Sequence, residues 1–358
     1  MRIAQVAPLI ESVPPMLYGG TERVVSHLVE ELVRQGHDVT LFASGDSRSS
    51  ARLVPVCPQA LRLSGTCQDF VAPHVLTLEQ VLRRADEFDV VHFHVAPLHF
   101  PVARRCLPAH VTTLHGRLDL PELAPLYQEF TDIPCVSISD AQRVPLPRAN
   151  WRATIHHGLP PASFPFQPRR GSYLAFLGRI SPEKRADRAI AIARACGQRL
   201  RIAAKVDPAD AGYFAREIRP LLDHPLIEFI GEISDREKGA FLGNASALLF
   251  PIDWPEPFGL VMIEALACGT PVVAFRGGSV AEVLEDGVTG FVVGSVGEAI
   301  DAVHRIGTLD RRRCRIAFER RFTVARMAAQ YVEVYKGVMA GEPPLAGLTE
   351  PPCSTSYA

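Results

Sequence analysis

Seven residues separate Glu256 from Glu264 in the stretch DWPEPFGLVMIEALACGT, and the residues between them can hold an anion. The Pro-Phe-Gly turn predicts a helix that starts near Leu260. The backbone N–H groups of Phe258, Gly259 and Leu260 then lie at a helix N-terminus, which suits a phosphate, and glycine lets the backbone approach closely. Glu264, one turn further on, can reach a hydroxyl-bearing group such as ribose, while Glu256 faces the other side. We therefore expect one acid at each end of a phosphate-linked sugar nucleotide.

The segment GRISPEKR, residues 178–185, supplies positive charge after an apolar run. Only 4 of the 38 basic residues are lysines, so Lys184 in a Gly/Pro turn indicates that a compact point charge is needed there, as on a phosphate. Arg179 can form a bidentate fork to the same diphosphate. The alternative for residues 178–185 is an exposed turn without a ligand. The alternative for residues 256–264 is a solvated turn and helix surface. The two segments together favour the binding site.

Several common motifs are absent from the sequence. No G-x-G-x-x-G follows the first predicted strand, and there is no G-x-x-x-x-G-K-[ST] or G-x-S-x-G, which argues against dinucleotide sites, P-loop phosphotransferases and nucleophile-elbow hydrolases. No two aspartates are separated by one residue, so the D-x-D metal clamp is missing as well. We therefore expect no metal and no cofactor, with any diphosphate neutralised by the protein's own groups.

Histidines gather in the first half of the chain. His115 ends an apolar run and precedes Gly116, and His92 and His94 share one face of another run with His99 nearby. These three could suggest zinc, but no cysteine or carboxylate stands at ligand spacing. The interpretation that we favour is that they line an acceptor pocket or satisfy strand ends.

The elements that must position these residues alternate between apolar strands and amphipathic helices, which predicts parallel sheets covered by helices. Before residue 160 we expect strands at 2–6, 39–43, 90–95, 111–115 and 135–138, with helices at 21–35 and 78–84. After residue 170 we expect strands at 173–177, 200–204, 227–230, 247–250, 271–274 and 290–293. The helices expected there are 185–196, 209–222, 234–243, 260–268, 296–306 and 324–339.

Four prolines in the ten residues 159–168 indicate a linker between two domains. We expect a first domain at 1–160, a linker at 161–170, a second domain at 171–323 and a disordered tail at 341–358. Both domains should be doubly wound and Rossmann-like. Such sheets bind ligands beyond the carboxyl ends of their strands, so a cleft between the domains is the expected site.

Charge and cysteine content exclude some classes of protein. The formal net charge is −1, so nucleic acid is not expected as a partner. Eight cysteines without a C-x-x-C pair indicate reduced thiols and a cytoplasmic protein. No apolar run is long enough to span a membrane. The basic run RRRCR at 311–315, with Arg320 and Arg321, is expected on a solvated helix face, with a weak contact to an anionic membrane surface as the alternative.

Three segments together resemble the family 4 glycosyltransferases, which are retaining enzymes of the GT-B architecture. They are E-P-F-G-L-x-x-x-E at 256–264 followed by A-C-G-T-P-V-V, G-R-x-x-x-x-K at 178–184, and Tyr18-Gly19-Gly20-Thr21-Glu22 after the first strand. The resemblance extends over about residues 1–340. It implies two Rossmann-like domains that face a central cleft, with the acceptor bound by the first domain and the nucleotide sugar by the second. It also implies that the helix at 324–340 packs back on the first domain.

The resemblance also implies roles for individual residues. Arg179 and Lys184 should bind the donor diphosphate, and Glu264 the ribose. Glu256 should lie against the transferred sugar, beside the 258–260 amides.

In the first domain, the resemblance implies that Gly19 and Gly20 form a loop that closes over the donor. His115 should approach the donor sugar or the acceptor hydroxyl. A capped strand end is the alternative for this histidine.

The function implied is retaining, metal-independent transfer of a hexose from a nucleoside diphosphate sugar to a hydroxyl of a glycan, lipid or small molecule. Two alternatives stay open. A sugar-nucleotide epimerase of the same architecture needs no acceptor, and a non-catalytic sugar-nucleotide binding protein turns nothing over.

Overall fold

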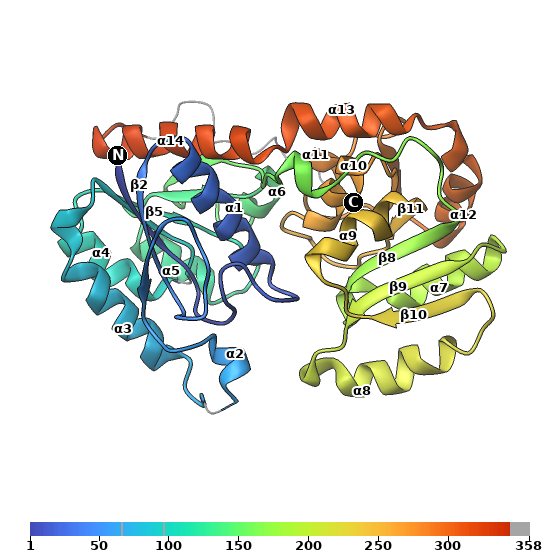
Figure 1. The fold of residues 1–358 in the computed structure, drawn as a ribbon, viewed down its shortest axis with the longest axis horizontal. Coiled ribbons are helices and arrows are strands. Elements are labelled where there is room, and N and C mark those ends of the chain that lie inside the picture. The colour runs from blue at the N-terminus through green and yellow to red at the C-terminus, as the bar shows by residue number, and fades with distance from the viewer. Residues whose placement is uncertain (66, 96, 344–358) are drawn as a thin grey trace. The chain divides into compact units, whose positions relative to one another are not determined.

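The computed structural model describes residues 1–65, 67–95 and 97–343. Packing divides these residues into two units (Figure 1). Unit 1 comprises Met1–Gly158 and the described residues from Val324 on, and unit 2 comprises Leu159–Thr323. The expected tail at 341–358 lies outside the described residues from position 344. Among the described residues, no helix combines the length and the apolar character needed to cross a bilayer.

Unit 1 contains a parallel sheet of seven strands in the order β3-β2-β1-β4-β5-β6-β7. The strands are β1 Arg2–Val6, β2 Asp38–Ala43, β3 Arg52–Pro55, β4 Val90–Phe93, β5 His110–Thr113, β6 Cys135–Ser137 and β7 Trp151–Thr154. The sequence analysis missed β3 and β7. Both are edge strands of four residues with half-buried positions, so neither has the continuous apolar run of a central strand.

Helices cover both faces of this sheet. They are α1 Gly20–Arg34, α2 Leu61–Ser64, α3 Val71–Leu82, α4 Phe100–Cys106, α5 Leu123–Glu129, α6 Asp140–Arg143 and α14 Val324–Met339. Side chains alternate along β1, so Ala4 and Val6 join a core with Val81 of α3 and Ala103 of α4. Gln5 points to the opposite face, where its amide bonds to Tyr335 of α14.

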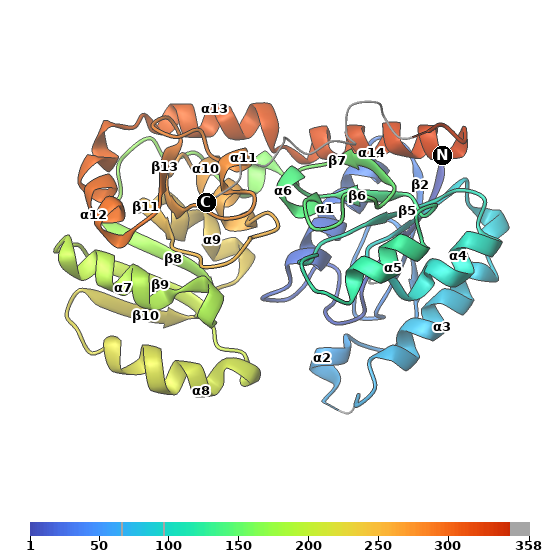
Figure 2. The same ribbon diagram turned by 180° about the vertical axis from the view of Figure 1, so that it is seen from behind.

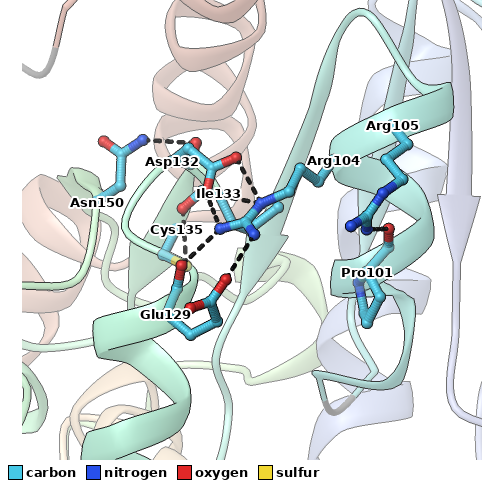
Figure 3. Close-up of polar contacts among 8 residues, drawn as sticks. All are labelled: Pro101, Arg104, Arg105, Glu129, Asp132, Ile133, Cys135 and Asn150. Carbon is cyan, nitrogen blue, oxygen red and sulfur yellow. Dashed lines mark hydrogen bonds and ion pairs between the residues drawn. The ribbon is translucent and has the colours of Figure 1, made fainter.

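A polar cluster on Arg104 fastens α4 to the segment between α5 and β6 (Figure 3). The guanidinium donates to both carboxylate oxygens of Asp132 and to the carboxylate and backbone carbonyl of Glu129. It also lies 4.3 Å from the ring centroid of Phe130. Asn150 holds the same segment by donating to the carbonyl of Asp132, so this loop is tied down on two sides.

Unit 2 contains a parallel sheet of six strands in the order β10-β9-β8-β11-β12-β13 (Figure 2). The strands are β8 Tyr173–Arg179, β9 Leu200–Lys205, β10 Ile227–Gly231, β11 Ala245–Phe250, β12 Val272–Phe275 and β13 Gly290–Val293. The chain builds one half of the sheet from β8 outward and then returns to pair β11 with β8. The switch point of the topology therefore lies between these two strands, where α/β sheets bind ligands.

The helices of unit 2 form two groups. They are α7 Ala186–Ala195, α8 Ala211–Tyr213, α9 Asp235–Gly243, α10 Leu260–Ala267, α11 Val280–Val283, α12 Val296–Arg305 and α13 Arg311–Arg321. Helices α7 and α12 contact one another, and α10 contacts α9 and α13. The helix expected at 209–222 is present as a continuous helical segment at 208–221, but its type changes from 3₁₀ through α and π back to 3₁₀. Gly212 and Pro220 weaken a regular helix there.

The basic run expected on a solvated face instead holds part of unit 2 together. Arg311 of α13 is buried, and its guanidinium donates to the carbonyls of Gln167, Gly243 and Ala245 and to Oγ1 of Thr270. The expectation of solvation is therefore wrong for Arg311.

Arg315, one turn along α13, is also engaged within unit 2. Its guanidinium donates to the carbonyls of Phe164 and Ala267. The proline-rich segment around residues 164–167 is consequently anchored to α13.

Candidate functional site

The structure brings the two charged segments of unit 2 together at the switch point of its sheet. The first segment follows β8 and the second follows β11, and these neighbouring strands run parallel. Their carboxyl ends therefore share one edge. The backbone N–H of Asp253 donates to the carbonyl of Glu183 at 2.9 Å, which joins the two segments directly.

Lys184 and Glu256 form an ion pair at this junction. The ammonium group of Lys184 donates to Oε2 of Glu256, and the indole N–H of Trp254 donates to the same oxygen at 2.9 Å. The ammonium also lies 4.9 Å from the ring of Trp254 and 5.6 Å from the ring of Phe250. The side chains of Lys184 and Glu256 are only 17% and 9% exposed, so their interaction is weakly screened.

Arg179 lies at the end of β8 with carboxylates beside it. Its guanidinium contacts Glu183 at 2.7 Å and Asp210 at 3.4 Å, and 36% of the side chain is exposed. Both cations that the sequence assigns to a diphosphate are therefore already paired with acids. A phosphate ligand has to share these cations with the carboxylates or displace them.

Arg185, next to Lys184, has a φ of +52°, in the left-handed region that costs energy for a residue with a Cβ. Ion pairs hold it there. Its guanidinium contacts Asp187 and Asp253, each at 2.8 Å, and Arg188 contacts Asp253 at 3.0 Å. Asp253 thus fixes the turn that presents Lys184, a role that the sequence analysis did not assign.

The loop before α10 has the predicted form. Helix α10 begins at Leu260, and Gly259 caps it with a φ of +79°. A Cβ on Gly259 would lie 2.8 Å from Cε of Met262 and 3.0 Å from Cζ of Phe250, so glycine is required for space as well as for conformation. The first N–H groups of the helix follow this turn, as an anion site requires.

A second loop supports the backbone around Phe258. The Ser279 hydroxyl donates to the carbonyl of Phe258 at 2.7 Å, and its N–H donates to the carbonyl of Glu256 at 3.0 Å. Gly278 packs so closely that a Cβ there would lie 2.1 Å from the carbonyl oxygen of Glu256. The sequence analysis missed this support, although the Gly-Gly-Ser run at 277–279 after a strand is a usable signal.

Glu264 is buried on α10 with a lysine as its partner. Its Oε1 accepts from the ammonium group of Lys238 at 3.2 Å, and Lys238 also lies 3.0 Å from Asp235. The two side chains of the pair are 3% and 11% exposed. The sequence predicts a role for Glu264 but does not reveal Lys238 beside it.

Unit 1 presents its glycine loop at the start of α1. Gly19 precedes the helix and Gly20 is its first residue. A Cβ on Gly19 would lie 2.7 Å from Cβ of Pro15, so the close packing of this loop requires glycine. Arg23 donates to the carbonyl of Leu17 at 2.6 Å and fastens the loop to α1.

His115 follows β5 and belongs to a group of histidines at the centre of unit 1. Its Nε2 lies 2.9 Å from Nδ1 of His94, and its ring stacks on His157 with centroids 5.4 Å apart. Burial lowers the pKa of His115 to about 3. It also lowers the pKa values of His92 and His94 well below the usual value. These histidines are therefore neutral near pH 7.

His99 lies apart from this group. Its Nε2 bonds to the hydroxyl of Thr112 at 2.7 Å, and its ring stacks on Phe93. Within the described residues, no group of three or more His, Cys, Asp or Glu side chains is arranged to hold a metal ion.

Two family models match the chain. The model described as glycosyl transferases group 1 matches residues 165–313, and the model described as Glycosyltransferase Family 4 matches residues 18–211. The chain belongs to glycosyltransferase family 4. This family 4 glycosyltransferase is thus a transferase enzyme, as the motifs at 178–184 and 256–264 predict.

Similar proteins support the assignment over nearly the whole length of this glycosyltransferase. It is 28% identical to a phosphatidyl-myo-inositol mannosyltransferase of Propionibacterium freudenreichii subsp. shermanii, over 85% of this chain and 86% of that protein. The crystal structure of AviGT4, a glycosyltransferase involved in avilamycin A biosynthesis, aligns with a TM-score of 0.72 and 28% identity, over 95% and 98% of the two chains. Anabaena HepE, solved in complex with UDP and glucose, aligns with a TM-score of 0.71 and 19% identity, over 94% and 100%. The glycosyltransferase has the expected two-domain, Rossmann-like GT-B fold.

Proposed function

We propose that this enzyme transfers a hexose, with retention of anomeric configuration, from a nucleoside diphosphate sugar to an acceptor hydroxyl. The observation that carries the proposal is the junction of the two charged segments at the switch point between β8 and β11. It places Lys184 and Glu256 in contact beside the loop that precedes α10. The presence of UDP in the HepE structure supports a nucleoside diphosphate as the ligand.

Each part of the donor has a proposed partner in unit 2. Arg179 and Lys184 bind the diphosphate, with the backbone amides of residues 258–260 beside them. Glu264 binds the ribose, and Glu256 lies against the transferred sugar. Glu256 already holds the ammonium of Lys184, so the acid that contacts the sugar and the cation that contacts the phosphate are positioned by the same hydrogen bond.

Unit 1 is proposed to bind the acceptor. Unit 1 also contributes the loop at Gly19 and Gly20, which we assign to the donor, and the neutral imidazole of His115, which we assign to the donor sugar or the acceptor hydroxyl. An imidazole that stays uncharged near pH 7 can hydrogen-bond a sugar hydroxyl without attracting an anion. The acceptor class is a carbohydrate, a lipid or a small molecule.

The proposed chemistry relies on fixed charge. As the bond between the sugar and the diphosphate breaks, negative charge grows on the leaving phosphate, and Arg179, Lys184 and the amides of α10 stabilise it. These groups supply the countercharge that a metal ion supplies elsewhere, so we propose a metal-independent reaction. We assign no covalent intermediate to Glu256, because its Oε2 already accepts from Lys184 and Trp254, and we propose that the acceptor attacks from the face that the diphosphate leaves.

We also propose that the enzyme works in the cytoplasm. The described cysteines, at positions 57, 67, 106, 135, 196, 268 and 314, are all free thiols. Free thiols persist in a reducing compartment.

The test is a panel of nucleoside diphosphate sugars incubated with purified protein, with and without candidate acceptors. Release of nucleoside diphosphate that depends on an acceptor, with an α-linked product from an α-linked donor by NMR coupling constants, supports the proposal. Conversion of the donor to a second sugar nucleotide without an acceptor indicates an epimerase. Binding without any turnover across the panel indicates a non-catalytic binding protein.

A further inference from the structure

A chain of hydrogen bonds runs through the buried centre of unit 1 and ends at His115. From His115 it passes to His94 and on to Gln5, with distances of 2.9 and 2.8 Å. Gln5 then bonds to the hydroxyl of Tyr335 on α14 at 2.9 Å. This series of hydrogen bonds therefore joins β1, the segments that follow β4 and β5, and helix α14.

The amide of Gln5 gives this chain a direction. Its nitrogen donates to Tyr335, and its carbonyl oxygen faces Nε2 of His94. A carbonyl oxygen only accepts, so Nε2 of His94 carries the proton. A neutral imidazole has one N–H, so Nδ1 of His94 must accept the hydrogen bond from Nε2 of His115. His115 therefore carries its proton on Nε2, and its Nδ1 keeps a lone pair.

The other branch of the chain is consistent with the same direction. The hydroxyl of Tyr335 accepts from Gln5 and can therefore donate to Nδ1 of His92 at 2.8 Å. Nε2 of His92 then donates to the hydroxyl of Thr113 at 2.7 Å, which in turn faces the hydroxyl of Tyr331 at 2.9 Å. With these directions, each contact from His115 to Thr113 has one donor and one acceptor, and no two hydrogens meet.

The imidazoles in this chain are neutral, as the argument requires. The rings that face His115 are His94, which follows β4, and His157, which follows β7. His92 on β4 stacks on His94 with centroids 3.9 Å apart. Burial is the first cause of the lowered pKa values of all four histidines, and their mutual repulsion adds to it for His92, His94 and His157.

Nδ1 of His115 is buried and has no hydrogen-bond partner among the described residues. A buried acceptor without a partner is costly, and natural proteins keep few of them. This one lies just beyond the carboxyl end of β5, at the edge of the sheet where ligands bind.

We propose that Gln5 and His94 are positioning residues that hold His115 as the neutral Nε2–H tautomer, so that Nδ1 accepts a hydrogen bond from a substrate hydroxyl. The part that concerns the substrate rests on the proposed function. The tautomer of His115 is a property of the protein without substrate and does not depend on the proposed function. Neither residue touches the substrate, because both act through the imidazole of His115.

The direct test is the tautomer of His115 in the intact protein labelled with ¹⁵N-histidine, read from long-range ¹H–¹⁵N correlations without any donor. The His115→Asn variant identifies the signal by its loss. We expect a proton on Nε2 and an unprotonated Nδ1 throughout pH 6–8. A proton on Nδ1, tautomers in exchange, or an imidazolium in this range would overturn the proposal.

Variants of His94 and His115 test the same chain by activity. The carbonyl oxygen of His94→Asn can still accept from Nε2 of His115, whereas His94→Leu cannot. We expect His94→Leu to lose the single tautomer and about tenfold in kcat relative to His94→Asn, the scale of one net hydrogen bond, with the donor KM unchanged. His115→Asn, whose amide occupies the position of Nδ1, should retain more kcat than His115→Gln. Equal kcat values for the two His94 variants, together with equal kcat values for the two His115 variants, would contradict the positioning role.

The outcomes separate this proposal from the proposed function. If no nucleoside diphosphate sugar is turned over but the NMR signal shows the Nε2–H tautomer, the proposed function fails and the assigned tautomer stands. If transfer occurs but the tautomer is the other one, only the positioning role is overturned.

Discussion

The ammonium nitrogen of Lys238 lies 3.2 Å from Oε1 of Glu264, and both side chains are almost fully buried. The sequence analysis gave Lys238 no role, yet it is one of only four lysines and holds the acid that we assign to the ribose. Removing one partner of a buried ion pair leaves the other charge uncompensated, which destabilises proteins by about 3–5 kcal/mol.

We therefore predict that Lys238→Ala lowers the free energy of unfolding of unit 2 by about 3 kcal/mol. The protein has two tryptophans, Trp151 in unit 1 and Trp254 in unit 2. Urea unfolding followed by Trp254 fluorescence in a Trp151→Phe background therefore reports on unit 2. Lys336→Ala is the matched control, because the Lys336 side chain is 58% exposed. If the two lysine variants unfold at the same urea concentration, the buried pair does not stabilise unit 2.

Arg311→Ala should also destabilise unit 2, by about 3 kcal/mol or more, because four oxygen acceptors lose a charged donor in a buried environment. The same fluorescence measurement checks this value. Arg313, two residues further along α13, is exposed and provides the control variant Arg313→Ala. A loss below about 1 kcal/mol in Arg311→Ala would show that these hydrogen bonds contribute little.

Lowering the pH from 7 to 5 should lower the free energy of unfolding of unit 1. The pKa values of His92, His94, His115 and His157 are lowered by burial, so the unfolded chain binds more protons than the folded one between about pH 6.5 and pH 3. The stability from these neutral histidines is fully present above pH 6.5 and is lost as the pH falls through that window. Each histidine contributes a slope that approaches about 1.4 kcal/mol per pH unit.

The measurement is urea unfolding followed by Trp151 fluorescence in a Trp254→Phe variant at pH 7, 6 and 5. We expect the free energy of unfolding of unit 1 to fall at each step. An unchanged or rising value would show that these histidines are protonated in the folded protein.

Much of the fold follows from the sequence because buried parallel strands are continuous apolar runs. Every central strand of both sheets was expected within one or two residues, and β13 and α14 have the predicted bounds. Edge strands β3 and β7 were missed because short, half-buried segments lack this signal. The segment at 209–222, which contains Gly212 and Pro220, was predicted as one regular helix, because amphipathic spacing does not reveal a local change of helix type.

The position of the candidate site could be predicted, but its internal pairing could not. Motif spacing places Lys184 and Glu256 after particular strands, and parallel topology then brings those strand ends together. That Lys184 pairs with Glu256, or Arg179 with Asp210, depends on side-chain directions that only the folded backbone defines. Gln5, like the Gly-Gly-Ser run at 277–279, carries a signal that the sequence analysis did not use, since a polar residue in the apolar strand RIAQV needs a buried partner.

Turnover should persist in excess EDTA. We assign the countercharge for the leaving diphosphate to Arg179, Lys184 and the amides before α10, and none of these groups depends on a divalent cation. The rate of nucleoside diphosphate release, measured before and after chelation and dialysis, checks this. Activity that disappears in EDTA and returns with magnesium or manganese would refute the metal-independent mechanism.

The central claim is that Lys184 binds the diphosphate of the donor at the junction of β8 and β11. Removing one fixed donor to a developing anion in a weakly solvated site lowers turnover on the order of 10²-fold or more. The Lys184→Ala variant should show this loss, whereas Lys336→Ala, on the exposed face of α14, should keep the wild-type rate.

The decisive measurement is therefore the rate of nucleoside diphosphate release by these two lysine variants, with the best donor and acceptor from the panel. Circular dichroism and thermal unfolding must first show that both variants are folded. The account predicts a fall on the order of 10²-fold or more for Lys184→Ala and no change for Lys336→Ala. Equal, near-wild-type rates in two folded variants would contradict it.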